Sequence, residues 1–202
     1  MEIIPAILPK SLEELNAKIS LVANEVDVIQ IDICDGVFVE NKTVDFDFLP
    51  HQEEVEFELD LMVKNAKDDF DKYLALNPKR IIFHLEAEEG LKEFIETLDP
   101  EIRDKVEIGV AINTTTLIKK LKSLLNVVDF IQCMGIKKIG VQGQPFDKKV
   151  LEHISELKRE ITLSVDGGVN KESIELLDVD RLVIGSYIFN NKNPVGVIKS
   201  LV

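Results

Sequence analysis

The sequence predicts an α/β fold, a single (β/α)8 or TIM barrel, in which residues 1–202 form one domain. Short apolar runs alternate with amphipathic segments from one end of the chain to the other. The runs are rich in Ile and Val on both faces, which is typical of parallel strands covered on both sides. Two runs end on Asp32 and Asp166, each soon followed by glycine, which places acids at the mouth of a parallel sheet.

Eight apolar runs have the length and composition of strands. They lie at residues 3–8, 28–32, 57–62, 80–85, 106–112, 130–134, 161–166 and 181–185. Eight strands, most of them followed by a helical segment, close naturally into a barrel. A doubly wound open sheet is the competing architecture. It usually carries a G-x-G-x-x-G motif after the first strand, and residues 7–11 contain none.

Amphipathic segments between these runs predict the helices. They lie at about 11–23, 66–76, 90–98, 115–125, 147–159, 171–177 and 194–201. Ser11 and Glu14 have the spacing of a capping box at the start of the first helix, and Asn170 is a suitable N-cap for the sixth. Pro50 and a cluster of acids interrupt any periodicity between the second and third strands.

Composition limits the class of protein. The formal charge of −13 argues against binding to nucleic acid or to an anionic membrane, both of which require a basic surface. No apolar run approaches the roughly 20 residues of a membrane span, and the N-terminus lacks the pattern of a signal peptide. The two cysteines, Cys34 and Cys133, fall at the ends of expected strands, which predicts buried, reduced thiols and a cytoplasmic protein.

Polar side chains at the ends of the strands are the candidates for chemistry, because barrel active sites lie at that end. Two acids that face one pocket, Asp32 and Asp166, would move a proton off one face of a substrate and onto the other. Gln30 lies two residues before Asp32 and therefore points to the same side of the strand. Asp60 and Met62 on the third strand are related in the same way.

Glycines gather in the loops after the last three strands, where (β/α)8 enzymes often bind a phosphate on backbone N–H groups. The candidate phosphate-binding residues are Gly140, Gly143, Gln144, Gly167, Gly168, Gly185 and Ser186. The acidic surface would not attract an anion from a distance. Any phosphate site must therefore be built locally from amides. Lys137 and Lys138 are expected to be solvated.

Seven segments together resemble the ribulose-phosphate 3-epimerase family over nearly the whole chain. They are residues 4–8, 31–39, 61–62, 84–87, 109–113, 165–170 and 185–189, in the order and spacing of that family. The resemblance implies a (β/α)8 barrel that inverts C3 of a pentulose 5-phosphate. It also implies that Asp32 and Asp166 are the catalytic acids, that both bind a divalent metal together with two histidines, and that the protein forms a homo-oligomer.

The sequence departs from the family at the implied metal and substrate positions. Gln30 and Asp60 occupy the two histidine positions, and Ala6 occupies that of a substrate-contacting serine. Gln30, Asp32, Asp60 and Asp166 offer only oxygen ligands, which suit Mg²⁺ or Mn²⁺ better than Zn²⁺ or iron. Without a metal, crowding of the carboxylates predicts that at least one pKa rises. No organic cofactor is expected.

The leading hypothesis is an epimerase that interconverts ribulose 5-phosphate and xylulose 5-phosphate, with Ala6, Met62 and Met134 against the sugar. The alternative is a catalytically impaired barrel that binds a phosphosugar in a regulatory role. A lyase of the hexulose-phosphate synthase type ranks lower, because it requires Asp-x-Lys-x-x-Asp and Cys34 occupies the lysine position. Of the histidines, His84 is expected in the core, and His51 and His153 on the surface.

Overall fold

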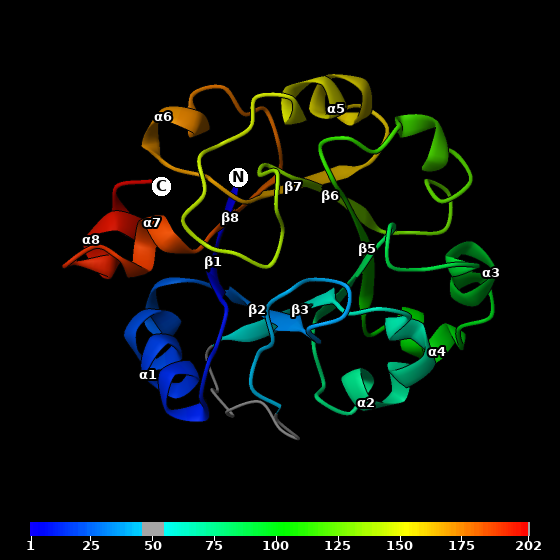
Figure 1. The fold of residues 1–202 in the computed structure, drawn as a ribbon, viewed down its shortest axis with the longest axis horizontal. Helices are drawn as coiled ribbons and strands as arrows, with labels where there is room; N and C mark the ends of the chain where they lie inside the picture. Colours follow the sequence, from blue (N-terminus) through cyan, green and yellow to red (C-terminus); the bar gives the residue numbers. More distant parts are fainter. Residues whose placement is uncertain (46–54, 202) are drawn as a thin grey trace.

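The computed structural model describes residues 1–45 and 55–201, which form a closed barrel of eight parallel strands (Figure 1). In chain order the strands are β1 (Glu2–Ile7), β2 (Val28–Cys34), β3 (Glu56–Met62), β4 (Arg80–His84), β5 (Glu107–Ile112), β6 (Phe130–Met134), β7 (Thr162–Asp166) and β8 (Arg181–Ile184). Each strand pairs with the next, and β8 pairs with β1. The predicted barrel is confirmed.

Helices surround the barrel (Figure 1). They are α1 (Leu12–Val22), α2 (Phe70–Leu74), α3 (Leu91–Glu96), α4 (Pro100–Arg103), α5 (Val150–Leu157), α6 (Lys171–Ile174), α7 (Ser186–Phe189) and α8 (Pro194–Lys199), with 3₁₀ turns η1 (Ala23–Glu25), η2 (Ala66–Asp69) and η3 (Ile118–Lys120). No helix among the described residues is long and apolar enough to cross a bilayer.

The predicted helix at 115–125 is wrong, since this segment contains only η3 and a run of turns. It begins in three consecutive threonines, whose branched side chains lose rotamer freedom in a helix. Two capping predictions can be compared directly. Asn170 forms a reciprocal capping box with Ser173. Ser11 accepts from the Glu14 N–H, whereas the Glu14 carboxylate accepts from Lys10, one residue before the expected partner.

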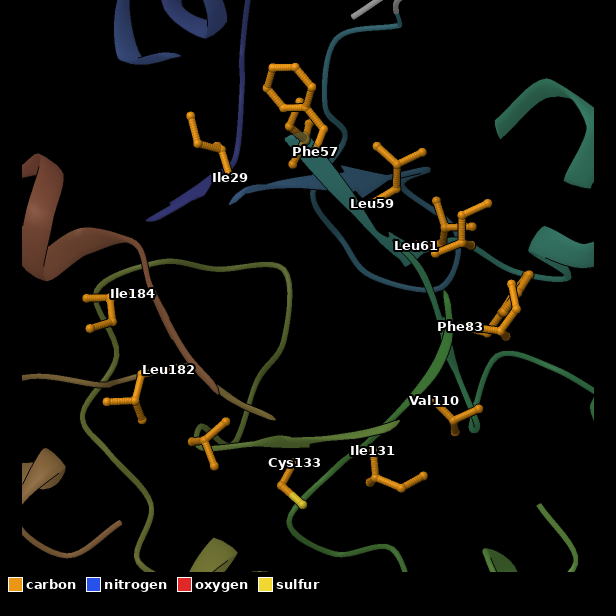
Figure 2. Close-up of a cluster of buried hydrophobic side chains, with 14 of the residues drawn as sticks. Ile29, Phe57, Leu59, Leu61, Phe83, Val110, Ile131, Cys133, Leu182 and Ile184 are labelled. Carbon is orange, nitrogen blue, oxygen red and sulfur yellow. The ribbon is translucent and has the colours of Figure 1, made fainter. Parts of the chain in front are cut away.

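The main apolar core lies between the barrel and its helices. Figure 2 shows outward-pointing residues from successive strands, among them Ile29, Leu59, Phe83, Val110 and Ile131, and these five are fully buried. Because side chains alternate along a strand, the neighbouring residues of each strand point into the barrel. The alternation therefore fixes which polar residues reach the interior.

One histidine prediction is wrong. His153 is buried and does not lie on the surface. It is on α5 in register with Val150, Ile154 and Leu157, which form the buried stripe of that helix. His51 and Pro50 lie outside the described residues. Cys34 and Cys133 are both buried free thiols, as predicted.

A network of charged side chains, with Arg80 and Glu58 buried at its centre, fills the N-terminal end of the barrel. The Arg80 guanidinium lies 2.8 Å from the Glu58 carboxylate, 3.0 Å from Glu2 and 3.3 Å from Glu107. Arg181 pairs with Glu107 at 2.8 Å. Although Arg80 favours ionised Glu58, burial is the larger effect and raises the pKa of Glu58 to about 7.

Just above these charges the Phe130 ring fills the interior, and the Arg181 guanidinium lies 4.7 Å from its centroid. Phe130 is paired in register with Gly109 on β5. A Cβ at Gly109 would overlap the Phe130 ring, so the absence of a side chain there makes room for the aromatic residue.

Gly109→Ala is expected to lower the free energy of unfolding by about 1–3 kcal/mol, the usual cost of overpacking a core. Urea unfolding followed by circular dichroism measures the change. Combining it with Phe130→Leu should recover part of the loss, because the smaller side chain frees space beside position 109. Equal stability of wild type and Gly109→Ala would contradict this packing.

Candidate active site

A pocket opens at the C-terminal ends of the strands and contains about 500 Å³ of empty space, part of it open to solvent. The structure places Asp32 and Asp166 in its wall. All of the predicted substrate and phosphate residues also line it: Ala6, Met62, Met134, Gly140, Gly143, Gln144, Gly167, Gly168, Gly185 and Ser186. Gln30 and Asp60 are fully buried and are not part of its lining.

Three carboxyl groups meet beside this pocket. Asp32, Asp60 and Asp166 each provide one oxygen, and these three oxygens lie within 4.8 Å of one another. Asp32 is near the end of β2, Asp60 is on β3 and Asp166 is the last residue of β7. All three are buried. Such a cluster of hard oxygen donors can hold a divalent cation.

Gln30 links the two acids that line the pocket. Its Nε2 donates to Asp32 Oδ1 at 2.8 Å and to Asp166 Oδ2 at 3.1 Å. The amide oxygen, the atom expected to bind a metal, has no hydrogen-bond partner. In this arrangement Gln30 serves the carboxylates as an N–H donor. It would offer its oxygen only after the carboxamide rotates by half a turn.

Asp60 is hydrogen-bonded to His84, a contact that the sequence did not reveal. His84 Nε2 lies 2.8 Å from Asp60 Oδ1, and Gln132 Nε2 donates to Asp60 Oδ2 at 3.5 Å. Both His84 and Asp60 are fully buried. Burial lowers the pKa of His84, but the surrounding carboxylates, Asp60 foremost with Glu86 and Asp166, together outweigh burial and the net shift of this pKa is upward. His84 is a core residue, as expected, and it orients Asp60.

Burial and mutual repulsion raise the pKa values of Asp32 and Asp166. Burial, followed by the charges of Asp166 and Asp60, raises the pKa of Asp32 well above its usual value. Burial and the charge of Asp60 raise the pKa of Asp166 to about 7. The sequence predicts that at least one carboxyl pKa in this cluster is raised, and the pKa values of Asp32 and Asp166 are both raised. With its pKa at about 7, Asp166 can both release and accept a proton near neutral pH, which acid–base catalysis requires.

The glycines after β7 and β8 have two roles. A Cβ at Gly167 would lie 2.8 Å from the Ile136 side chain, and one at Gly168 would lie 2.7 Å from the Phe146 backbone, so the two loops pack closely. Within the part of the chain that the structure describes, the N–H groups of Gly167, Gly168 and Gly185 have no hydrogen-bond acceptor. These N–H groups are free to bind an oxyanion.

Comparisons with known proteins agree with this architecture. A model of the ribulose-phosphate 3-epimerase family matches residues 2–189. The ribulose-phosphate 3-epimerase of Helicobacter pylori J99 is 30% identical, over 100% of this chain and 96% of that protein. The ribulose-phosphate 3-epimerase of Bacillus subtilis is 26% identical, over 100% and 98%.

Solved structures show the same fold at lower identity. The structure of KGPDC from Streptococcus mutans has a TM-score of 0.69 at 17% identity and covers 99% of this chain and 94% of that one. A 3-hexulose-6-phosphate synthase has a TM-score of 0.68 at 17% identity and covers 100% and 98%. At this identity the likeness concerns the barrel alone.

Proposed function

Because the chain belongs to the ribulose-phosphate 3-epimerase family, we propose that it interconverts ribulose 5-phosphate and xylulose 5-phosphate by moving a proton between the two faces of C3. The family and its curated relatives identify the chain as an isomerase. The observation that supports C3 chemistry is the meeting of Asp32 and Asp166 at one pocket, with an oxygen of each within 4.8 Å.

Asp32 and Asp166 act as the acid and the base. They come from β2 and β7, which are separated by β8 and β1, so a ligand between them meets one carboxyl on each face. One carboxylate removes the C3 proton, and the other, protonated carboxyl returns a proton to the opposite face. The raised pKa values support this division, since the buried cluster retains a proton near neutral pH.

The phosphoryl group lies on the free N–H groups of Gly167, Gly168 and Gly185, beside the Ser186 hydroxyl. The described lining of the pocket contains no Lys, Arg or His side chain. Neutral donors must therefore bind the phosphate, in accord with the acidic composition of the chain. Met62 and Met134 provide apolar surface for the sugar.

Solvent-deuterium incorporation tests the reaction. Ribulose 5-phosphate in D₂O is expected to gain deuterium at C3 and to form xylulose 5-phosphate when the purified protein is added, as followed by NMR. The reaction is run with EDTA and then with Mg²⁺, Mn²⁺ or Zn²⁺. No exchange under any of these conditions would refute the epimerase, and retained binding of the phosphosugar would instead support the regulatory barrel.

The donor set fits a hard divalent cation, because three carboxylate oxygens lie within 4.8 Å and repel one another unless a proton or a cation intervenes. Asp32, Asp60 and Asp166 would hold it, with Gln30 as a fourth ligand once its unpartnered oxygen faces the cluster. A bound cation would supply positive charge near the negative charge that develops in the substrate. We favour Mg²⁺ or Mn²⁺ because none of these ligands is nitrogen or sulfur.

Mn²⁺ at millimolar concentration is expected to raise the Tm of the protein by several degrees, because binding to the folded state alone stabilises it. Differential scanning fluorimetry measures the shift, and elemental analysis identifies any metal that is purified with the protein. Asp60→Asn should lose the shift, since it removes one of the three carboxylates. Tight binding of Zn²⁺ with no response to Mg²⁺ or Mn²⁺ would contradict the predicted selectivity.

A further inference from the structure

Gln142 extends into the pocket from the loop between β6 and α5. Figure 1 draws this loop in yellow-green, running around the β8 label and close to the β1 label. Contacts confirm the proximity: Gln142 Nε2 donates to the Ala6 carbonyl oxygen on β1 at 3.4 Å, and a Cβ at Gly185 after β8 would lie 2.7 Å from the same nitrogen. Gln142 therefore lies over the end of the pocket that contains Gly185 and Ser186.

Apart from the two acids, only three side chains with N–H or O–H donors occur in the described lining of the pocket: Gln142, Gln144 and Ser186. The Gln144 carboxamide is already hydrogen-bonded to backbone atoms of its own loop. Its Nε2 donates to the carbonyl oxygens of Lys138 and Val141, and its Oε1 accepts from the Lys138 N–H. Among the described residues, Gln142 is held by one side-chain hydrogen bond, the 3.4 Å contact with Ala6, and breaking so long a contact costs little.

An anionic ligand needs such donors here. Asp32 and Asp166 are the charged side chains of the described lining, and both repel an anion when ionised. The Gly185 N–H is free, and the Gln142 amide nitrogen is close enough to Gly185 to converge with it on one ligand oxygen. A hydrogen bond from a neutral amide to a phosphoryl oxygen is charge-assisted and stronger than one to a carbonyl.

We propose that Gln142 is a substrate-binding residue that selects for the phosphoryl group. Its carboxamide leaves the Ala6 carbonyl and donates to a phosphoryl oxygen beside Gly185. This inference rests on the proposed function, because it assumes that the ligand is a phosphosugar whose phosphoryl end lies on Gly185. Gly140 and Gly143, two residues before and one residue after Gln142, have φ values of +75° and +80°, a left-handed backbone conformation that favours glycine in this loop.

Calorimetric binding of ribulose 5-phosphate to the Asp166→Asn protein provides the test, because this variant is expected to turn the ligand over about 10²- to 10⁴-fold more slowly than the wild type. Adding Gln142→Ala should weaken binding about tenfold to a hundredfold, the range for losing a hydrogen bond to a charged group. Adding Gln142→Glu should weaken it further, since a carboxylate of similar size repels the phosphate. Affinity for unphosphorylated ribulose should not fall in either case.

Lys137→Ala is the matched control, because this exposed lysine is on the same loop and outside the pocket. It should leave affinity within about twofold, as expected for a surface site. Equal binding by Asp166→Asn with and without Gln142→Ala would overturn the role of Gln142 and leave the proposed function standing. A well-folded Asp166→Asn protein that binds no ribulose 5-phosphate would overturn the proposed function and this inference with it.

Discussion

Asp166→Asn is expected to lower kcat for epimerisation by about 10²- to 10⁴-fold, the usual contribution of a positioned acid or base. The asparagine can neither accept nor deliver the C3 proton. Asp32 remains, and it loses the repulsion of Asp166, which contributes to its raised pKa. Asp32 is then more fully ionised near neutral pH. The variant should therefore still exchange the C3 hydrogen of the one epimer that presents it to Asp32.

NMR in D₂O distinguishes these outcomes when each epimer is supplied separately. Asp32→Asn is the mirror-image control and should exchange the C3 hydrogen of the other epimer. Both variants should interconvert the two epimers about 10²- to 10⁴-fold more slowly than the wild type. If both variants exchanged the same epimer, or if each retained full epimerisation, the two carboxyls would not act on opposite faces of the substrate.

Arg80→Met is expected to destabilise the protein by about 3–5 kcal/mol, because it leaves the Glu58 carboxylate buried without its partner. The Arg80 and Glu58 side chains are only 4% and 1% exposed, so water cannot replace the 2.8 Å contact between them. Urea unfolding at pH 8 measures the loss. The double variant with Glu58→Leu should recover much of it, since an apolar pair can replace a buried ion pair.

The loss of unfolding free energy caused by Arg80→Met should increase as the pH rises. Burial already raises the pKa of Glu58 from its ordinary value of 4.5 to about 7 beside Arg80, and removing the cation raises this pKa further. The folded variant keeps the proton on Glu58 at pH values at which the unfolded chain has released it. Stability is therefore greatest below about pH 4.5 and falls as pH rises through the folded-state pKa. A loss of unfolding free energy that is larger at pH 5.5 than at pH 8 would contradict the raised pKa of Glu58.

The meeting of Asp32 and Asp166 could be predicted because it depends on two regularities. Side chains alternate along strands, and the strands of a barrel end at one face. The bond between Asp60 and His84 depends on the register of β3 with β4. Asp60 is paired with Ile82, and His84 follows two residues later on the same face. The pairing register of β3 with β4 cannot be read from a single sequence.

The direction of Gln30 and the place of Gln142 could not be predicted for other reasons. The two ends of a carboxamide have nearly the same shape, so only the neighbouring carboxylates decide that the Gln30 nitrogen faces them. Gln142 lies in a loop without periodicity, and its importance follows from how closely Gly185 approaches it. The position of His153 is mispredicted because its polar neighbours in sequence conceal a helical stripe that buries it.

The charged network at the N-terminal end determines how a ligand can enter and leave the barrel. Phe130, Arg80 and Glu58 are each less than 5% exposed and seal that end, so the interior is a blind chamber and not a channel. Substrate and product must enter and leave one after the other through the same mouth. Gln142 lies at that mouth, so the residue that binds the incoming substrate must also release the product. Its affinity for the phosphoryl group therefore has an upper limit, because tighter binding would slow product release.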